Sequence, residues 1–368
     1  MKVAVVELGT CGVNYQSKYL NYQIAENFSL TKSINDADII VMMGGCCCID
    51  DTMKQSLEII NYVLENKKSD AITYLTGCIT HGFKDIPKLI EIENFLKQNI
   101  DVIIPHYEPN KLLQALSYDK FSELLVDDFG MVETEEDFAD IYIQNGCTHA
   151  CTFCKTNYLN YRLKSTPIEE IKETIDELDS HGITTIQLRG LNLAQYGLDL
   201  YHEYKLMEIC KYVEKKKNID KLILSGVAIR DAIKGDFASQ IKHFEKTKGI
   251  VCSLESGSDR ILKLMKKGFT VYEFLKFFET INSINKKGSF INIVSGFPTE
   301  TIEDCKMTLQ VLKELLPRVV NINTYADSEF IPSHDLGVLT DQEIKEHTRI
   351  YKKGLKSAKI PYQINGAN

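Results

Sequence analysis

Short apolar runs that end at Gly or Pro alternate with helix-like stretches in the first third of the chain. The runs are VAVVELG, DIIVMMG, AITYLTG and DVIIP, all rich in Val and Ile. Runs of this length and composition are typical of buried parallel strands. Between them, the spacing of apolar residues predicts helices over roughly 15–27, 51–66 and 86–98. This βαβα order predicts a parallel sheet covered by helices.

The same alternation returns in the rest of the chain. Six further apolar runs, separated by helical patterns, are DIYIQNG, TTIQLRG, KLILSG, IVCSLESG, FINIVSG and VVNINTY. Six such units predict a partial (β/α)6 barrel, in which chemistry takes place at the C-terminal ends of the strands. After Asp327 the pattern predicts one helix, near 341–357, and a short tail. The expected fold is therefore α/β, with an N-terminal parallel α/β domain followed by a partial barrel.

Charge divides the chain at about the same place. Of the net charge of -8, residues 1–126 carry -5, residues 127–140 carry -7 with no base, and the remainder carries +4. An acidic run with few aliphatic residues is typical of a solvated linker. The expected organisation is then a first domain over 1–126, a linker over 127–140, a barrel over 141–326 and a helical tail over 327–368. The overall acidity does not favour nucleic-acid binding.

Composition excludes several classes of protein. No apolar run approaches the length of a membrane span, and the N-terminus lacks the pattern of a signal peptide, so we expect a cytoplasmic protein without a membrane partner. The chain has 11 cysteines. An odd number in such a protein argues against a disulfide framework and indicates metal binding or thiol chemistry. The sequence predicts no particular oligomeric state.

The densest group of cysteines directly follows the first predicted barrel strand. Cys147, Cys151 and Cys154 have the spacing CxxxCxxC within NGCTHACTFC. Three thiolates so spaced can hold an iron–sulfur cluster and leave one iron open for a cofactor. Zinc is the competing ligand, but structural zinc normally takes four protein ligands. His149 could be a fourth ligand, although it is more simply a residue that lines the loop.

A second group of cysteines has no local motif. Cys11, Cys46 and Cys78 each stand just beyond the C-terminal end of a predicted strand in the first domain. In a parallel sheet these ends share one edge, so the three side chains are expected to converge. This placement predicts a second three-thiolate cluster. Cys47 or Cys48 could take the place of Cys46 as the ligand.

The cysteine loop resembles that of the radical S-adenosylmethionine (SAM) superfamily, whose signature is CxxxC, an aromatic residue and a final Cys. Phe153 occupies the aromatic position. In that superfamily a 4Fe-4S cluster binds SAM at its open iron and, once reduced, cleaves it to a 5′-deoxyadenosyl radical that abstracts hydrogen. The resemblance implies an external electron donor such as flavodoxin or ferredoxin.

The same resemblance implies SAM contacts at the ends of successive strands. By analogy Phe153 lies near the adenine, Gly190 and Asn192 at the methionine end, and Ser225 and Glu255 near the ribose. Ordinary roles compete with these: Phe153 could pack in the core, Asn192 could cap a turn, and Glu255 could pair with Arg260.

Further motifs resemble the methylthiotransferase branch of the superfamily. They are ELGTCGVN, ADIIVMMGGCCCIDD and LTGC in the first domain, and STPIEEI, LRGLNLAQYG, LESGSDRILKLMKKGFT and SGFPTETIED in the barrel. The resemblance implies SAM, two 4Fe-4S clusters and insertion of a methylthio group at an unactivated C–H bond, with the auxiliary cluster carrying the sulfur. Two departures are the Gly pair before Cys46, where the family has Asn-Thr, and Glu255, where it commonly has Gln.

The resemblance leaves the substrate open. Known members modify an adenosine in tRNA or an aspartate in a ribosomal protein, and usually end in a TRAM domain, for which residues 327–368 are too few. With the acidic balance, this slightly favours a peptide or protein side chain over tRNA. Alternatives are a radical SAM enzyme that uses its auxiliary cluster without methylthio transfer, and a regulatory metal-binding module. A cobalamin enzyme is less expected, because the first domain lacks an Asp-x-His-x-x-Gly loop.

Overall fold

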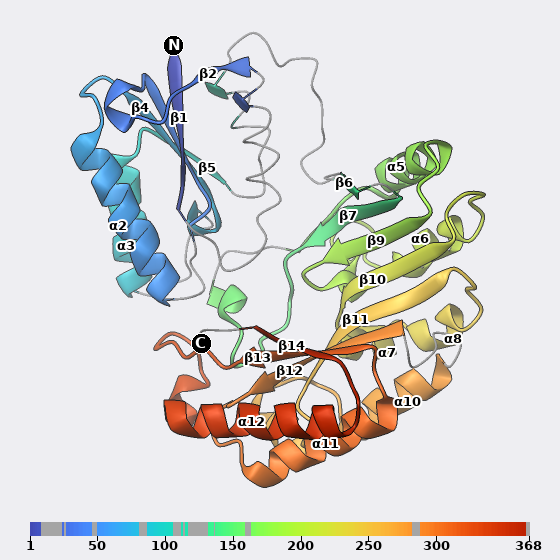
Figure 1. The fold of residues 1–368 in the computed structure, drawn as a ribbon. Helices are drawn as coiled ribbons and strands as arrows, with labels where there is room; N and C mark the ends of the chain where they lie inside the picture. Colours follow the sequence, from blue (N-terminus) through green and yellow to red (C-terminus); the bar gives the residue numbers. More distant parts are fainter. Residues whose placement is uncertain are drawn as a thin grey trace. The chain divides into compact units, whose positions relative to one another are not determined.

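The computed structural model divides the chain into two compact units (Figure 1). The first unit comprises 1–131 with 158–161, and the second comprises 132–157 with 162–368. The structure describes residues 1–8, 24–25, 27–45, 50–80, 87–105, 112, 115–116, 132–135, 137–158, 163–281 and 288–365. Each unit is considered separately below. Within these ranges, no helix combines the length and apolar character that a bilayer crossing requires.

The first unit contains a parallel sheet with helices packed against it. Its strands lie in the order β2-β1-β3-β4-β5. The elements are β1 (Lys2–Glu7), β2 (Ser29–Leu30), η1 (Ile34–Asp36), β3 (Ile39–Met43), α2 (Asp50–Asn66), β4 (Ile72–Gly77), η2 (Cys78–Thr80), α3 (Pro87–Asn99) and β5 (Val102–Pro105). The four predicted strands and two of the three predicted helices are confirmed. Most of the helix expected over 15–27 lies outside the described residues.

Three strands of this sheet are adjacent and end level with one another. Glu7 of β1 pairs with Met43 of β3, which pairs in turn with Thr76 of β4. All five residues of β3 are buried, as expected for the central strand of a parallel sheet covered on both faces. The segments that follow β1, β3 and β4 therefore leave the same edge of the sheet side by side.

The second unit is built on a larger sheet with the order β14-β13-β12-β11-β10-β9-β7-β6, and β8 pairs with β7. The strands are β6 (Val132–Glu135), β7 (Phe138–Asn145), β8 (Lys164–Ser165), β9 (Thr185–Gly190), β10 (Lys221–Val227), β11 (Thr247–Glu255), β12 (Ser289–Ser295), β13 (Val319–Thr324) and β14 (Tyr362–Asn365). The six predicted barrel strands correspond to β7 and β9–β13, which pair in parallel. The predicted α/β fold with parallel sheets is confirmed.

Helices cover the outer face of this sheet (Figure 1). They are α5 (Ile168–Ser180), α6 (Leu206–Val213), α7 (Ile229–Lys234), α8 (Phe237–Ile241), α9 (Asp259–Leu264), α10 (Val271–Thr280), α11 (Ile302–Leu315) and α12 (Asp341–Ser357), with the 3-10 turns η3 (Lys155–Tyr158), η4 (Leu193–Gln195) and η6 (His334–Leu336). In α5, Ile171, Ile175 and Leu178 recur at helical spacing and join the core with Ile186 and Leu188 of β9.

The opposite face of the strands is more polar. Gln187 and Arg189 alternate with the core residues of β9, and both donate hydrogen bonds to Asp140 of β7, at 2.8 and 2.7 Å. Further along the sheet, Asn321 of β13 donates to Asn292 of β12 at 2.9 Å. Since side chains alternate between the two faces of a strand, the same β/α pattern supplies an apolar outer core and a polar inner surface.

The structure differs from the expected linker and tail. Within the acidic run, β6 pairs antiparallel with β7, Glu135 lying opposite Phe138. β6 is the last strand at this end of the sheet. At the other end, β14 extends the sheet as a parallel partner of β13, with Val320 opposite Tyr362. Such a short edge strand carries little periodic signal, so the sequence predicted only a tail there.

Candidate functional site

The cysteine loop lies directly after β7, at the C-terminal end of a barrel strand. Cys151 is buried, Cys147 and Cys154 are half-buried, and none of them forms a disulfide. Burial raises the pKa of Cys151 to about 11, an effect that nearby Lys267 reduces but does not reverse. Burial also raises the pKa of Cys147. The thiols of Cys147 and Cys151 are therefore protonated at neutral pH, and a metal group would have to displace these protons.

The three sulfur atoms spread more widely than the ligands of a single ion. Among the described residues, only Glu300, Cys305 and His347 form a trio of potential ligands whose donor atoms all lie within 4.8 Å of one another. One zinc ion with sulfur ligands at about 2.3 Å would draw three sulfurs closer than that. In this geometry the three thiols do not gather around one zinc ion.

Two glutamines hold the loop in place. Gln195 of η4 accepts from the Thr148 amide at 3.0 Å and donates to its hydroxyl at 2.7 Å. Gln144 of β7 donates to the Gly146 carbonyl at 2.6 Å. On the other side, the Thr152 hydroxyl donates to the Leu264 carbonyl at 2.8 Å. The loop is thus tied to three separate elements of the barrel before any cofactor binds.

A buried polar group surrounds Cys147. The Asn192 amide donates to Asp231 at 2.8 Å and to the Cys147 sulfur at 3.4 Å. His149 Nε2 lies 2.6 Å from Asp231 Oδ2, so this histidine does more than line the loop. Burial alone would raise the pKa of Asp231, but His149 and Asn192 outweigh it and hold this pKa below its usual value.

A buried ion pair stands near Cys151. Glu255 ends β11 with a φ of 67°, and its side chain lies 3.2 Å from Lys267 Nζ, the two side chains being 9% and 12% exposed. Burial alone would lower the pKa of Lys267, but Glu255 and Cys151 raise it, so the ammonium remains charged. The alternative pairing of Glu255 with Arg260 is wrong, because Arg260 pairs with Asp304.

The predicted SAM contacts lie at the ends of neighbouring strands. Gly190, Ser225 and Glu255 come from β9, β10 and β11 respectively. Gly226 has a φ of +91°, and a Cβ there would lie 2.0 Å from the Gly190 carbonyl oxygen, so the exits of β9 and β10 pack backbone to backbone. Phe153 packs edge-on against Phe297, with ring centroids 6.3 Å apart.

The residues present fit a cluster with SAM. Asn192 Oδ1 is buried and, among the described atoms, has no hydrogen-bond partner. A buried acceptor of this kind calls for a donor, which the ammonium group of SAM would supply. The roles of Phe153, Gly190, Ser225 and Glu255 toward SAM remain predictions.

Sequence reasoning missed several residues that shape the site. Asp231 and Gln144 lie in none of the quoted motifs, whereas Gln195 lies within LRGLNLAQYG, although its contact with the loop depends on the tertiary fold. Lys267 lies within the LESGSDRILKLMKKGFT motif, which could have pointed to it.

In the first unit the structure bears on one of the three predicted auxiliary ligands. Cys78 is half-buried and begins η2, directly after β4. Cys11 and Cys46, together with Cys47 and Cys48, lie outside the described residues. They follow β1 and β3, the strands that lie beside β4 in the sheet. Convergence of the three thiols remains a prediction.

Backbone hydrogen bonds link the segments that precede these cysteines. The Leu8 amide donates to Met43 at 2.9 Å, and the Ile79 amide donates to Gly45 at 3.1 Å. Buried Ser56 of α2 donates to the Leu8 carbonyl at 2.8 Å. Gly44 and Gly45, the pair that departs from the family pattern, have φ of 94° and 76°. Glycine adopts such positive φ values without the steric cost that other residues incur.

We expect Gly77→Ala to destabilise the first unit. Gly77 has a φ of +121°, and a Cβ would lie 1.8 Å from the Gly44 carbonyl oxygen. Backbone strain alone costs about 1–3 kcal/mol, and the clash adds to it. Hydrogen exchange would measure the loss in the strands beside each glycine, β3 and β4 for Gly77 and β9 for Gly182. Gly182→Ala is the control, since Gly182 has a φ of +79° but nothing within 4 Å. Equal losses of stability in the two variants would contradict a steric clash between the new Cβ and the Gly44 carbonyl oxygen.

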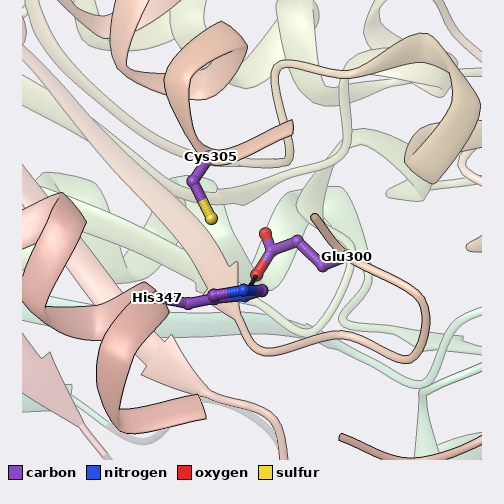
Figure 2. A group of neighbouring side chains, drawn as sticks. All are labelled: Glu300, Cys305 and His347. Atoms are coloured by element: carbon purple, nitrogen blue, oxygen red, sulfur yellow. Dashed lines mark hydrogen bonds and ion pairs between the residues drawn. The ribbon is translucent and has the colours of Figure 1, made fainter. Parts of the chain in front are cut away.

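The remaining described cysteines are core residues. Cys210, Cys252 and Cys305 are at most 1% exposed. Burial raises the pKa of each thiol well above its usual value. Cys305 nevertheless belongs to the trio with Glu300 and His347 (Figure 2).

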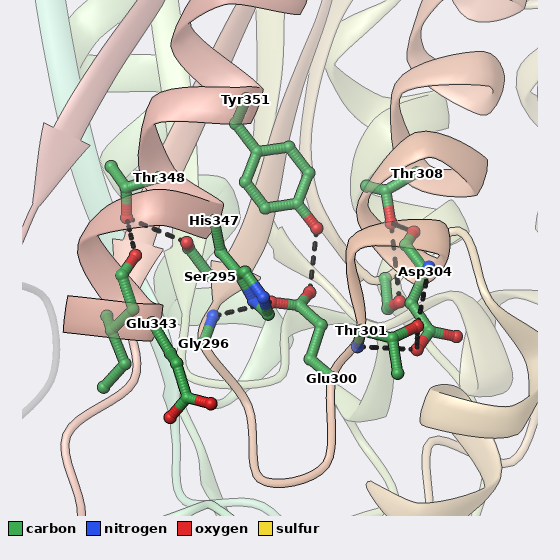
Figure 3. Close-up of polar contacts among 12 residues, drawn as sticks. Ser295, Gly296, Glu300, Thr301, Asp304, Thr308, Glu343, His347, Thr348 and Tyr351 are labelled. Atoms are coloured by element: carbon green, nitrogen blue, oxygen red, sulfur yellow. Dashed lines mark hydrogen bonds and ion pairs between the residues drawn. The ribbon is translucent and has the colours of Figure 1, made fainter. Parts of the chain in front are cut away.

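This trio forms a closed hydrogen-bond network. Glu300 Oε2 accepts from the Gly296 amide at 2.8 Å and lies 2.8 Å from His347 Nδ1, while Oε1 accepts from the Tyr351 hydroxyl at 2.8 Å (Figure 3). A metal ion bound to Glu300 would have to displace these donors, and the Gly296 amide would lose its hydrogen bond to Glu300. The network instead anchors α12 to the loop after β12.

Glu300→Gln is expected to lower the free energy of unfolding by about 3–5 kcal/mol, the usual cost of removing one partner of a buried pair. The amide would remove the counter-charge of His347 and bring a second donor against the Gly296 amide. Urea unfolding would measure the change. The matched control is Glu303→Gln, whose side chain is 65% exposed and should change stability by less than about 0.5 kcal/mol. If Glu300→Gln lowered the free energy of unfolding as little as the control does, the role of Glu300 as an anchor of α12 would be contradicted.

The anchor also predicts a pH dependence. Its hydrogen bond to Glu300 raises the pKa of His347 above the ordinary value of 6.5. A group whose pKa is higher in the folded state than in the unfolded state stabilises the fold while it is protonated. This stabilisation is complete below the unfolded-state pKa, and it is lost as the pH rises through the folded-state pKa. The contribution of His347 to the free energy of unfolding should therefore disappear as pH rises. The difference in the free energy of unfolding between wild type and Glu300→Gln should then become smaller. A gap that widened with pH would contradict this assignment.

Comparison with known proteins agrees with this site. Residues 141–312 match the Radical SAM superfamily. The threonylcarbamoyladenosine tRNA methylthiotransferase MtaB of Aquifex aeolicus is 28% identical over 96% of this chain and 87% of its own length. The ribosomal protein uS12 methylthiotransferase RimO of Christiangramia forsetii is 26% identical over 94% of this chain and 75% of its own length.

Solved structures agree in fold. The radical SAM methyltransferase TsrM of Kitasatospora setae superposes with a TM-score of 0.57 at 12% identity, covering 90% of this chain and 73% of TsrM. The radical SAM enzyme OxsB gives a TM-score of 0.53 at 14% identity over 96% of this chain, which spans only 56% of OxsB. Residues 141–312 are thus a radical SAM domain, and over nearly its whole length the chain is similar to radical SAM methylthiotransferases, in agreement with the cysteine loop at the end of β7.

Proposed function

We propose that this enzyme inserts a methylthio group at an unactivated C–H bond of a peptide or protein side chain. The observation that supports it is the placement of two three-cysteine sets. Cys147, Cys151 and Cys154 follow a strand of the barrel, and Cys11, Cys46 and Cys78 each follow one of three adjacent strands in the first unit. In this proposal each set holds a 4Fe-4S cluster, and the second set carries the sulfur.

The chain's own residues would bind and orient the cofactors. The cluster with SAM supplies a hydrogen-abstracting radical when bound. Asn192 offers its buried oxygen to the SAM ammonium, and its amide group supports Cys147. Lys267 keeps a positive charge near Cys151, which offsets the charge of the thiolates. Phe153 packs edge-on against buried Phe297, so an apolar surface would face the cofactor at this end of the barrel.

Charge supports a peptide or protein as the substrate class. The chain carries a net charge of -8, which disfavours broad contact with a phosphate backbone. The relatives named RimO act on ribosomal protein uS12. The second candidate is an adenosine in tRNA, favoured by the similarity to MtaB. Either reaction needs an external electron donor such as flavodoxin or ferredoxin.

Mass spectrometry of candidate substrates tests the proposal. The anaerobically reconstituted enzyme, with SAM and dithionite, would be incubated with peptides, ribosomal proteins and bulk tRNA. We expect a gain of one SCH2 unit in a peptide or protein, carrying the label when SAM has a deuterated methyl group. A gain of this mass in tRNA alone would contradict a peptide or protein as the substrate class. Cleavage of SAM without gain in any substrate would overturn methylthio transfer.

A further inference from the structure

A basic hollow lies on the surface of the second unit, beside the cysteine loop. It has a volume of about 720 Å³ and is lined by residues of α7, of α9 and of the segment that joins α9 to α10. Four cations line it, namely Arg230, Lys234, Lys263 and Lys266. None of these four forms an ion pair with another residue in the described ranges. The hollow is a concentration of positive charge on an otherwise acidic protein.

The two acids at the hollow already have structural partners. Asp259 accepts from the Val271 amide at 2.7 Å. Glu273 accepts from the Thr270 amide and hydroxyl, both at 2.8 Å, and so caps α10. These hydrogen bonds hold both carboxylates against the backbone at the start of α10. The four cations, by contrast, are available to an incoming partner.

One segment of chain separates the hollow from the cysteine loop. Lys266 and Gly268 line the hollow, whereas Lys267, between them, turns its side chain to Glu255 near Cys151. Just before them, the carbonyl of Met265 accepts from the Thr152 amide at 3.1 Å. A short path of hydrogen-bonded backbone therefore connects the basic hollow to the loop that would hold the cluster.

Resting on the proposed function, we infer that this hollow is the docking site of the electron donor, an acidic one-electron carrier protein. The proposed chemistry starts with a one-electron reduction of the cluster, in which the carrier loses one electron and the cluster gains it. The carrier must approach closely without entering the barrel, because the substrate and SAM occupy the interior. A basic hollow separated from the cysteine loop by one segment of chain meets both needs, and charge complementarity steers such encounters.

The mixed surface argues against RNA as the partner here. Nucleic acids present a row of phosphates, which Asp259 and Glu273 at the hollow would repel. An acidic protein can place its carboxylates on the cations and its amides beside the two acids. Leu262 and Phe269 give the hollow an apolar floor, which suits a protein contact with a dry centre.

The test compares two ways of reducing the reconstituted full-length enzyme. Reduced flavodoxin would serve as the probe of the carrier class, and dithionite as a small reductant that needs no docking site. Bleaching of the cluster absorbance, followed by stopped flow, reports the electron transfer itself. This readout needs no methylthio product, so failure of the docking site and failure of the proposed function are distinguishable.

For the double variant Lys263→Glu with Lys266→Glu, we expect reduction by flavodoxin to slow about tenfold at low salt, because two attractive charges become repulsive. The wild-type rate should also fall with rising salt. Reduction by dithionite should be unchanged. The control is Lys211→Glu with Lys215→Glu, an equal charge change at two exposed lysines of the same unit, for which we expect less than about a twofold effect.

Two results would overturn the inference. The first is an unchanged rate of reduction by flavodoxin in the hollow variant. The second is an equal slowing in the control variant, which would indicate an effect of net charge rather than of a docking site.

Discussion

Replacing Cys147, Cys151 and Cys154 together with Ala is expected to abolish formation of 5′-deoxyadenosine from SAM. These residues are the only protein ligands that the radical SAM signature supplies, so the variant would lose the iron to which SAM binds. Iron content should fall from about eight to about four per chain. Chromatography of the nucleoside product and iron analysis of the anaerobically reconstituted protein would measure the two effects.

The control for this experiment uses cysteines outside both predicted clusters. Cys210 and Cys252 are at most 1% exposed and belong to the barrel core. Their double replacement with Ala should retain iron and SAM cleavage, with a modest loss of stability. If SAM cleavage persisted in the iron-reconstituted triple variant, the assignment of the SAM-binding cluster would fail.

The second large effect is expected from the first unit. Replacing Cys11, Cys46 and Cys78 with Ala should leave SAM cleavage intact and end methylthio transfer. The physical reason is that the two sets belong to separate compact units with their own cores, so loss of one cluster need not unfold the other. Product mass spectrometry, together with the assay for 5′-deoxyadenosine, separates the two reactions.

Single variants would resolve the ligand among the three consecutive cysteines. Cys46→Ala should lose the auxiliary iron, whereas Cys47→Ala and Cys48→Ala should retain it. Loss of the auxiliary iron in Cys47→Ala or Cys48→Ala, with iron retained in Cys46→Ala, would assign the ligand to Cys47 or Cys48 instead. An iron content of about four per chain in the wild type would contradict the two-cluster proposal altogether.

Several features of the fold followed from local pattern. The runs of Val and Ile placed six barrel strands and four strands of the first sheet, all confirmed. Parallel strands buried on both faces read as continuous apolar runs, which is the clearest signal that a short strand can give. Short edge strands give no such signal, so β6 and β14 were missed.

The candidate site divides in the same way. The spacing of Cys147, Cys151 and Cys154 is local, and sequence alone pointed to an iron–sulfur cluster. The contacts around them are long-range: Asp231 reaches Asn192, and Lys267 reaches Glu255, through the packing of α7 and of the α9–α10 segment. The sequence could suggest only the nearer Arg260 as a partner for Glu255, whereas the fold gives Arg260 to Asp304.

By itself, the sequence determined the α/β class, the cysteine loop after the first barrel strand and the placement of three further cysteines after predicted strands. These depend on residue type and spacing over a few positions. Only the tertiary structure decided that β1, β3 and β4 are adjacent and end level, that Glu300 anchors α12, and that four cations gather beside the cysteine loop. Such contacts join residues far apart in the chain, and side-chain packing and burial, rather than local pattern, select them.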